Sequence, residues 1–336
     1  MNTREIVNRR KSNIGTSFVT TIKSNLGILI GLAVLCIALT ILTDRFATST
    51  NFFNIVRQIT INLYLAIGMT FVILLGRIDL SVGAILAVSG CISAGMVALV
   101  GLPVPIGILV GLLAGTTLAL CSGFFISRTT IPAFIITLAM MNIARGIARV
   151  YTDAQTIPVL NEAYTFLGMG SIFGLPVQLY LVVLVIAVSS FILNRTQIGR
   201  HIYAVGGNQQ AAEYSGINIK KVTMFVFIFS GIMASIAGAL TVGRTFAATM
   251  FMGEGSEMDA IAAVVLGGTS MSGGKGTIAG TVIGCIIIGV LRNGMNLLGI
   301  SSSWQFIVQG IVIILAVYID HVKQEGLKIP LIRKAA

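Results

Sequence analysis

Residues 106–126 read Ile-Gly-Ile-Leu-Val-Gly-Leu-Leu-Ala-Gly-Thr-Thr-Leu-Ala-Leu-Cys-Ser-Gly-Phe-Phe-Ile, with no charged side chain among them. An α-helix needs about 20 mainly apolar residues to cross the hydrocarbon core of a bilayer. This stretch is long enough to do so. It therefore predicts a membrane-spanning helix and points to a membrane protein.

The whole 336-residue chain has the same character. Its residues are 56% hydrophobic and 10% charged, and its mean hydropathy is +0.97. Soluble domains are about 25% charged, so a soluble fold is excluded. The net charge of +11 would suit a nucleic-acid partner, but the basic residues lie in short gaps between apolar stretches. In a membrane protein those gaps hold the residues that set orientation.

Further apolar stretches predict an all-α membrane protein with about ten transmembrane helices. The predicted spans are 25–43, 55–75, 82–100, 106–126, 132–150, 177–194, 221–242, 257–268, 277–294 and 303–320. The eighth is short and is predicted to be a broken or half-length helix, which neighbouring helices would have to bury. The first follows a basic segment, but it is too long for a signal peptide and no cleavage site follows it.

The lysines and arginines indicate the orientation of these spans. With both termini in the cytoplasm, the outer side holds only these of the 22 basic residues: Arg45, Arg57, Arg145, Arg149, Arg244 and Arg292. Positive charge is concentrated on the cytoplasmic side of membrane proteins. We therefore expect cytoplasmic tails at 1–24 and 321–336, a transmembrane domain at 25–320 and a long cytoplasmic loop at 195–221. The longest outer loop, 151–176, shows no strong helical pattern.

Small residues recur at four-residue spacing inside several spans. Gly107, Gly111 and Gly115 do so in one span, and Gly280 and Gly284 in another. Such spacing lets helix backbones approach closely in lipid. It predicts either packing between helices of this chain or an interface between two copies.

Metal and nucleotide sites are not expected. The four cysteines (Cys36, Cys91, Cys121 and Cys285) lie in apolar segments, and His201 and His321 have no neighbouring ligand cluster. Residues 267–277 resemble a phosphate-binding loop, but Thr269 stands where its first glycine is needed and Gly276 where Ser or Thr is needed. If transport uses ATP and Mg²⁺, a partner subunit binds them.

Charged residues near span ends each allow two interpretations. Asp79 is either a helix cap or part of a transport pathway. Arg145 and Arg149 share one helix face and either extend to the outer surface or face a wet cavity. Glu254, Glu257 and Asp259 either favour a helix N-terminus or contact a sugar or partner.

Three segments together resemble one family. Residues 76–83 (Gly-Arg-Ile-Asp-Leu-Ser-Val-Gly) are similar to the G-G-I-D-L-S-V-G motif of ribose-type ABC importer permeases. Residues 206–217 (Gly-Gly-Asn-Gln-Gln-Ala-Ala-Glu-Tyr-Ser-Gly-Ile) resemble its G-G-N-x-x-A-A-x-x-S-G-I loop, and residues 258–276 resemble its L-D-A-I-A-A-V-V-L-G-G-T-S segment. The similarity extends from about Asn51 to Asp320. One departure is Arg77, where the family usually has glycine, so a tight turn there is in doubt.

The resemblance implies the transmembrane subunit of an importer. Such importers contain a second permease chain, usually identical, two cytoplasmic ATPase domains and a periplasmic sugar-binding protein. It further implies that the cytoplasmic loop docks on the ATPase through Gly206, Gly207, Asn208, Ala211, Ser215 and Gly216.

We therefore expect a permease of the bacterial inner membrane that imports a monosaccharide, with ribose as the first candidate. It would not be an enzyme. Candidate residues lining the pathway are Asn62, Asp79, Asn142 and Asp259. The alternatives are an ion-coupled secondary transporter, a membrane-embedded enzyme and a passive channel. Ionisable relays or catalytic clusters inside the spans would favour the first two, and the sequence shows neither.

Overall fold

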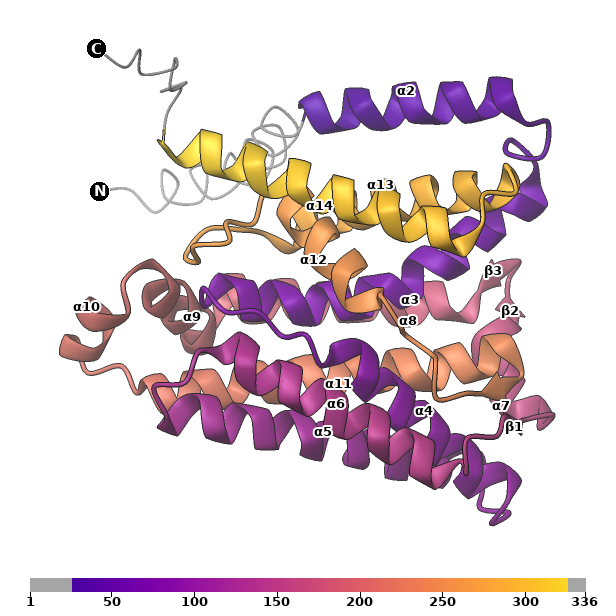
Figure 1. Ribbon diagram of the computed structural model, residues 1–336, viewed down its shortest axis with the longest axis horizontal. Helices are drawn as coiled ribbons and strands as arrows, with labels where there is room; N and C mark the ends of the chain where they lie inside the picture. Colours follow the sequence, from indigo (N-terminus) through magenta and orange to yellow (C-terminus); the bar gives the residue numbers. More distant parts are fainter. Residues whose placement is uncertain (1–25, 326–336) are drawn as a thin grey trace, which may run out of the picture.

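The computed structural model describes residues 26–325, which are mostly helical (Figure 1). The predicted N-terminal tail and most of the predicted C-terminal tail lie outside the described residues. The elements in chain order are α2 (Leu26–Leu42), α3 (Ser49–Leu74), α4 (Val82–Ala98), α5 (Val104–Arg128), α6 (Ala133–Tyr151), β1 (Ile157–Pro158), α7 (Glu162–Met169), β2 (Ser171–Ile172), β3 (Leu175–Pro176), α8 (Val177–Arg195), α9 (Gln197–Gly207), α10 (Gln209–Tyr214), α11 (Ile219–Thr245), β4 (Ala247–Ala248), α12 (Ser256–Leu266), α13 (Ile278–Leu297) and α14 (Ser302–Glu325).

A helix lies at each of the ten positions predicted for a span. Six of these helices, namely α3, α5, α6, α8, α11 and α13, are long and apolar enough to cross a membrane. The helices α2, α4 and α14 contain shorter apolar runs. With 11 residues, α12 is a half-length helix as predicted, since it covers only about 16 Å of a hydrocarbon core about 30 Å thick. The chain is thus an all-α, multi-pass membrane protein.

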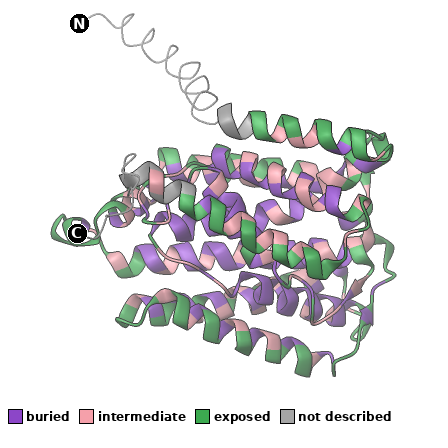
Figure 2. Cartoon of the chain, turned by 45° about the horizontal axis from the view of Figure 1, so that its top comes forward, coloured by how far each residue is buried: buried purple, intermediate pink, exposed green. Residues whose placement is uncertain are grey.

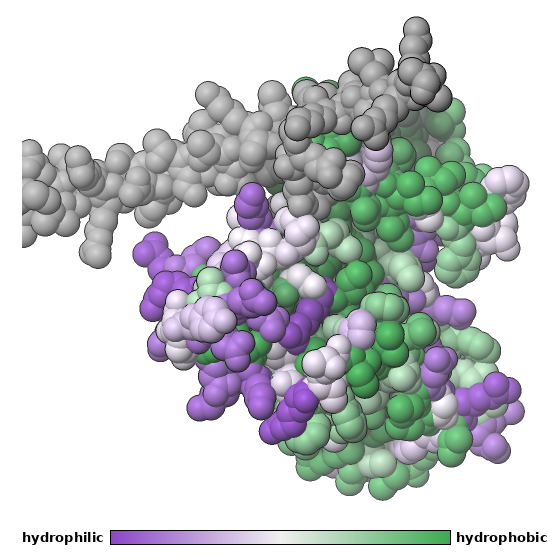
Figure 3. All heavy atoms as spheres, turned by 60° about the vertical axis from the view of Figure 1, so that its left-hand side comes forward, coloured by the Kyte–Doolittle hydropathy of each residue, from purple (hydrophilic) through white to green (hydrophobic). Residues whose placement is uncertain are grey.

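The helices lie roughly side by side and leave different elements at the two ends of the bundle (Figure 1). One end carries α9 and α10, and we call it the α9–α10 end. The other, which we call the hairpin end, carries α7 and the short strands. Hydrophilic residues gather at the α9–α10 end, beside hydrophobic surface (Figure 3). This distribution suits a bundle whose sides face lipid and whose ends face water.

Residues 151–176 form more regular structure than the sequence indicated. Instead of an irregular loop they contain α7, which begins where the Asn161 side chain accepts hydrogen bonds from the backbone N–H groups of Ala163 and Tyr164. The Tyr164 side chain is fully buried and bonds to Ser93. Strand β1 pairs antiparallel with β4, and β2 with β3. The prediction missed α7 because it depends on one cap and one tertiary contact rather than on a repeating apolar pattern.

The core forms around α11, which packs against α3, α4 and α5. The centroid of the Phe229 ring of α11 lies 4.4 Å from that of the Phe71 ring of α3, and the fully buried Phe227 faces Gly123 of α5. Buried residues fill the middle of the bundle (Figure 2). Glycines allow the close approaches. A Cβ on Gly111 would meet Ser89 and Ser93 of α4, and one on Gly284 would meet Ala263 of α12. The small residues of these two spans therefore serve packing within the chain.

Two segments turn back into the bundle and interrupt the helical pattern. Residues 75–81, between α3 and α4, bring Asp79 within 3.3 Å of the hydroxyl of Ser230, which lies near the middle of α11. Residues 249–255 precede α12, and a Cβ on Gly83 of α4 would meet both the Gly253 carbonyl and the Glu257 carboxylate. The N-terminal ends of α4 and α12 therefore meet inside the bundle. Non-helical backbone at membrane depth is tolerated where protein buries it.

Candidate functional site

Helices α9 and α10 form a capped, water-exposed element from the predicted cytoplasmic loop 195–221. Asn208 ends α9 and caps α10, because its side chain accepts a 2.9 Å hydrogen bond from the Ala211 backbone N–H. Gly216 follows α10 with a φ of +80°, a backbone conformation that favours glycine. Ala211 and Ser215 are exposed, and Tyr214 is 91% exposed. Five of the six predicted docking residues therefore belong to or border the exposed helix α10. Asn208 caps it, Ala211 lies in it, Ser215 and Gly216 follow it, and Gly207 precedes Asn208.

The sixth, Gly206, lies in a junction made of backbone. A Cβ on Gly206 would collide with the Leu74 carbonyl at the end of α3 and with the backbone of Gly274. The Gly274 N–H also donates to that Leu74 carbonyl at 2.9 Å. Three segments far apart in the sequence thus meet here: the end of α3, the end of α9 and the loop before α13.

The segment that resembles a phosphate-binding loop belongs to this junction. Gly273 and Gly274 have φ values of +85° and +71° and pack against Gly206, Gly207 and Gly76. The Tyr203 hydroxyl of α9 donates a 2.8 Å hydrogen bond to the Gly276 carbonyl. Burial raises the pKa of Tyr203 still further above neutral pH. Gly273 and Gly274 therefore allow close backbone contact between this loop and its neighbours.

Asp79 is fully buried in the segment that precedes α4. Its carboxylate accepts hydrogen bonds from the Ser81 backbone N–H at 2.9 Å and from the Ser81 hydroxyl at 2.5 Å, and its second oxygen lies 3.3 Å from the Ser230 hydroxyl. A buried charge needs such partners. Asp79 thus holds the turn before α4 and links it to α11, but it does not cap the helix: the N-cap residue of α4 is Ser81, which makes no side-chain capping hydrogen bond.

Arg145 and Arg149 behave differently although they share one helix. The Arg145 guanidinium donates to the carbonyls of Met250 and Met252 at 2.8 and 2.7 Å, whereas Arg149 is exposed. Arg145 therefore fixes the segment before α12, and Glu257 lies near enough to interact with it electrostatically. The sequence spacing did not distinguish these two arginines.

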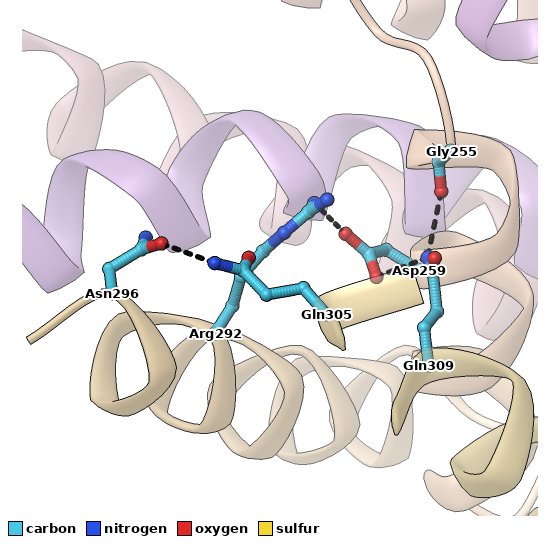
Figure 4. A network of polar contacts seen from close by, with 6 residues as sticks. All are labelled: Gly255, Asp259, Arg292, Asn296, Gln305 and Gln309. Carbon is cyan, nitrogen blue, oxygen red and sulfur yellow. Dashed lines mark hydrogen bonds and ion pairs between the residues drawn. The ribbon is translucent and has the colours of Figure 1, made fainter. Parts of the chain in front are cut away.

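Asp259 lies in a network of polar side chains from three helices (Figure 4). It is 4% exposed and forms an ion pair with Arg292 of α13. The Gln309 amide of α14 donates to Asp259 at 2.6 Å and to the Gly255 carbonyl at 2.9 Å. This network borders a cavity of about 20 Å³, which is room for about one water molecule. A carboxylate, a guanidinium and amides together are the groups that bind hydroxyl-rich ligands through directed hydrogen bonds.

The other two pathway candidates lie elsewhere. Asn142 is exposed on α6, and its amide bonds to the Leu138 carbonyl of its own helix at 3.2 Å. The side-chain nitrogen of Asn62 on α3 is buried and has no hydrogen-bond partner among the described residues. The recorded hydrogen bonds of Asp79, Asn142 and Asp259 all go to residues other than these four. Asp79, Asn142 and Asp259 therefore lie in separate hydrogen-bonded environments and do not bond to one another or to Asn62.

Several polar residues of these helices escaped the prediction. Asn51 of α3 and Asn293 of α13 exchange two amide hydrogen bonds of 3.1 and 2.9 Å. Gln305 of α14 donates to Asn296 at 2.8 Å, next to Arg292. A polar side chain inside an apolar helix is itself a signal, because it is costly in lipid without a partner. Within residues 26–325 no group of three or more His, Cys, Asp or Glu residues is arranged to hold a metal ion.

Comparison with known proteins gives a consistent result. Residues 51–317 match the family model described as branched-chain amino acid transport system / permease component. The chain is 44% identical over 304 residues to the ribose import permease protein RbsC of Bacillus subtilis, covering 90% of this chain and 94% of that protein. It is 44% identical to RbsC of Haemophilus influenzae, covering 87% and 91%, and 39% identical to the D-allose transport system permease protein AlsC of Escherichia coli, covering 83% and 85%. No solved structure matches the chain.

Proposed function

We propose that the chain, which belongs to the branched-chain amino acid transport system / permease component family, moves a monosaccharide, ribose in the first place, into the bacterial cell, because it is similar to ribose and D-allose permeases. It is a ribose-type permease subunit of an ATP-binding-cassette sugar importer and a multi-pass protein of the bacterial inner membrane. The observation that carries this function is the similarity to ribose import permeases along about nine tenths of the chain.

The proposed orientation places the α9–α10 end in the cytoplasm, with ten spans and both termini on that side. Two observations support it. The described part of the chain begins with α2 and ends with α14. The start of α2 and the end of α14 both lie toward the α9–α10 end (Figure 1). The basic residues of α9 and of the start of α11 (Arg200, Lys220 and Lys221) also lie there, as cytoplasmic positive charge requires.

We propose that α9 and α10 contact a separate ATPase subunit, which binds ATP and Mg²⁺. The exposed face of α10, with Tyr214 at its end, is the kind of surface that a partner covers. The chain itself supplies a pathway and no covalent chemistry. A periplasmic sugar-binding protein would deliver the sugar at the hairpin end.

The Gly206 junction supports a route from ATP hydrolysis to the pathway. It joins α9 to the end of α3 and to the loop before α13, and the segment after α3 leads directly into α4. A displacement of α9 would therefore reach the interrupted helices without passing through flexible side chains. Rigid-body movement of such helices around a fixed site is the basis of alternating access.

For the pathway we propose Asn62, Asp79, Asn142 and Asp259 together with a second copy of the chain. The exposed face of α6 supports the second copy. It presents Asn142, Gly146 and Arg149 at helical spacing, and polar groups facing lipid are costly. A second permease chain would cover them and close a pathway between the two copies.

The test is uptake of labelled ribose by cells that lack their own ribose importer and express this chain with an ATPase and a binding protein. The control carries an ATPase unable to hydrolyse ATP. Uptake that persists with a protonophore and disappears in the control supports the proposal. Uptake that ignores the ATPase mutation and collapses with the protonophore would instead establish ion coupling. Uptake of another sugar but not of ribose would retain the class and reject ribose.

A further inference from the structure

A cleft at the α9–α10 end has no part in the proposed pathway. It consists of two adjoining hollows of about 540 and 410 Å³, both bordered by Arg77, Ile126, Thr129 and Gln209. The first extends along the loop between α5 and α6, and the second extends along α10 to the start of α11. Ligand pockets have volumes of about 300–1,000 Å³, so either hollow has room for a small molecule.

Arg77 is the residue common to both hollows that carries a charge. Its guanidinium is partly buried and donates a 3.1 Å hydrogen bond to the Thr223 hydroxyl of α11. The one ion pair in the described part of the chain joins Arg292 and Asp259, so no described carboxylate pairs with Arg77. A guanidinium has five N–H donors, and a single neutral hydroxyl leaves most of them available.

The charged side chains that line the two hollows favour an anion, because Arg77 and Lys220 outnumber the single carboxylate of Glu213. Lys220 lines the second hollow, and so do Asn218 and Ile219 at the N-terminus of the 27-residue α11. A lysine beside an arginine that has no carboxylate partner attracts negative charge, and the dipole of α11 adds to this attraction, while the Asn218 side chain already accepts a hydrogen bond from the Lys221 backbone N–H. One carboxylate, that of Glu213, also lines this hollow, but it does not lie within ion-pair distance of Arg77.

The uncharged lining residues indicate what else the ligand carries. Thr129, Thr130 and Gln209 border the first hollow and Ser127 the second, and hydroxyls and amides both donate and accept hydrogen bonds. Arginine recognises phosphate through paired, parallel hydrogen bonds that a point charge cannot reproduce. We propose that this cleft binds the phosphate ester of a polyol, with the phosphate on Arg77.

Two sources share this chemistry: a phosphorylated sugar from the cytoplasm and the glycerol phosphate headgroup of a membrane lipid. A phosphorylated sugar is the product of the reaction class that would consume an imported monosaccharide. The choice of a phosphorylated sugar as the ligand rests on the proposed function, whereas the proposal of a phosphate site at Arg77 does not. The binding test below requires no transport, so the two proposals can fail separately.

The test uses the full-length permease in nanodiscs of neutral phosphatidylcholine. Ribose 5-phosphate, inorganic phosphate and ribose are each titrated by calorimetry against the wild type, Arg77→Gly and Lys221→Gln, a neighbouring lysine outside the cleft lining. A parallel arm measures retention of phosphatidylglycerol by native mass spectrometry. The melting temperature of each variant establishes that it is folded, and Arg77→Gln, which also removes the charge, replaces Arg77→Gly if the glycine variant is not.

We expect a phosphate ester, free or in lipid, to bind the wild type and Lys221→Gln alike and to bind the Arg77 variant about 10- to 100-fold more weakly, as loss of charge-assisted hydrogen bonds requires. Binding of ribose 5-phosphate alone identifies a cytoplasmic ligand, and Arg77-dependent retention of phosphatidylglycerol alone identifies a lipid. The proposal would be overturned if the wild type bound neither ribose 5-phosphate nor phosphatidylglycerol, if binding were unchanged in the Arg77 variant in both arms, or if ribose bound as tightly as its phosphate.

Discussion

Gly206 of α9 lies so close to the carbonyl oxygen of Leu74 at the end of α3 that no side chain fits between them. The neighbouring Gly207 is the opposite case, because a Cβ added there would meet nothing within 4 Å. Both positions have backbone conformations outside the positive-φ region. The pair therefore separates the effect of a methyl group in the junction from the effect of losing a glycine.

Gly206→Ala should disconnect α9 from α3. Inserting a methyl group into a filled contact costs about 1–3 kcal/mol, and here the neighbouring atoms are backbone that cannot rotate away. We expect ATP-dependent sugar uptake to fall several-fold while Gly207→Ala stays near the wild-type rate. Uptake in vesicles, normalised to the amount of permease, measures this. Wild-type rates for both variants would show that the junction transmits nothing, and an equal loss in both would assign the effect to the docking surface, to which Gly207 is also predicted to belong.

Arg145→Met should loosen the segment before α12. The variant leaves the Met250 and Met252 carbonyls without their shared donor, and each hydrogen bond to a charged group contributes about 1.5–3 kcal/mol. We expect a lower melting temperature in detergent and slower uptake. Arg149→Met is the matched control for the melting temperature, because Arg149 is exposed one turn away. It is no control for uptake, because Arg149 lies on the α6 face proposed to contact the second copy. A control that destabilises the protein as much would assign the effect to the charge of α6 in general.

The sequence was sufficient to predict the membrane class and a helix at each span, because apolar length in lipid leaves few alternatives. It also predicted the half-length helix, since the polar residues before α12 shorten the apolar run. The sequence also indicates the long connection at 195–221, but not its division into α9 and α10, which depends on caps such as Asn208. The helix α7 was missed for the same reason.

The candidate sites were harder to predict, because they depend on contacts between distant segments. Nothing in the local sequence distinguishes Gly206, which is enclosed, from Gly207, which is open, or Arg145 from Arg149. Asp259 was selected as an acid near a helix start, but its partners come from α13 and α14, up to 50 residues further along the chain. Only the three-dimensional packing of these helices brings Arg292 and Gln309 to it.

Arg292→Gln should destabilise the protein more than the double variant Asp259→Asn/Arg292→Gln. Removing one partner of a buried ion pair leaves an uncompensated charge and costs up to about 3–5 kcal/mol, whereas neutralising both partners is often much milder. Asp259 is 4% exposed and the Arg292 side chain 24% exposed, so solvent can compensate only in part. Melting temperatures of the two single variants and the double variant measure the coupling. Additive losses would mean that the pair contributes little.

Cysteines at the two ends of the bundle should react with a membrane-impermeant maleimide from opposite sides. Tyr214, at the end of α10, is 91% exposed, and Phe173, between β2 and β3, is 97% exposed. In a background that lacks the partly exposed Cys36 and Cys121, Phe173→Cys should be labelled in cells with a permeabilised outer membrane. Tyr214→Cys should be labelled only after the inner membrane is opened, because the basic α9–α10 end is expected in the cytoplasm.

The reverse pattern would place α9 and α10 in the periplasm, where no ATPase could reach them, and the coupling role of the Gly206 junction would fall with the orientation. Labelling of both positions from outside would instead mean that the chain does not cross the membrane between Phe173 and Tyr214. Between these two residues lies α8, which has 19 residues and is one of the six helices long and apolar enough to cross a membrane. The experiment therefore tests α8 as a span and the orientation of the whole bundle at once.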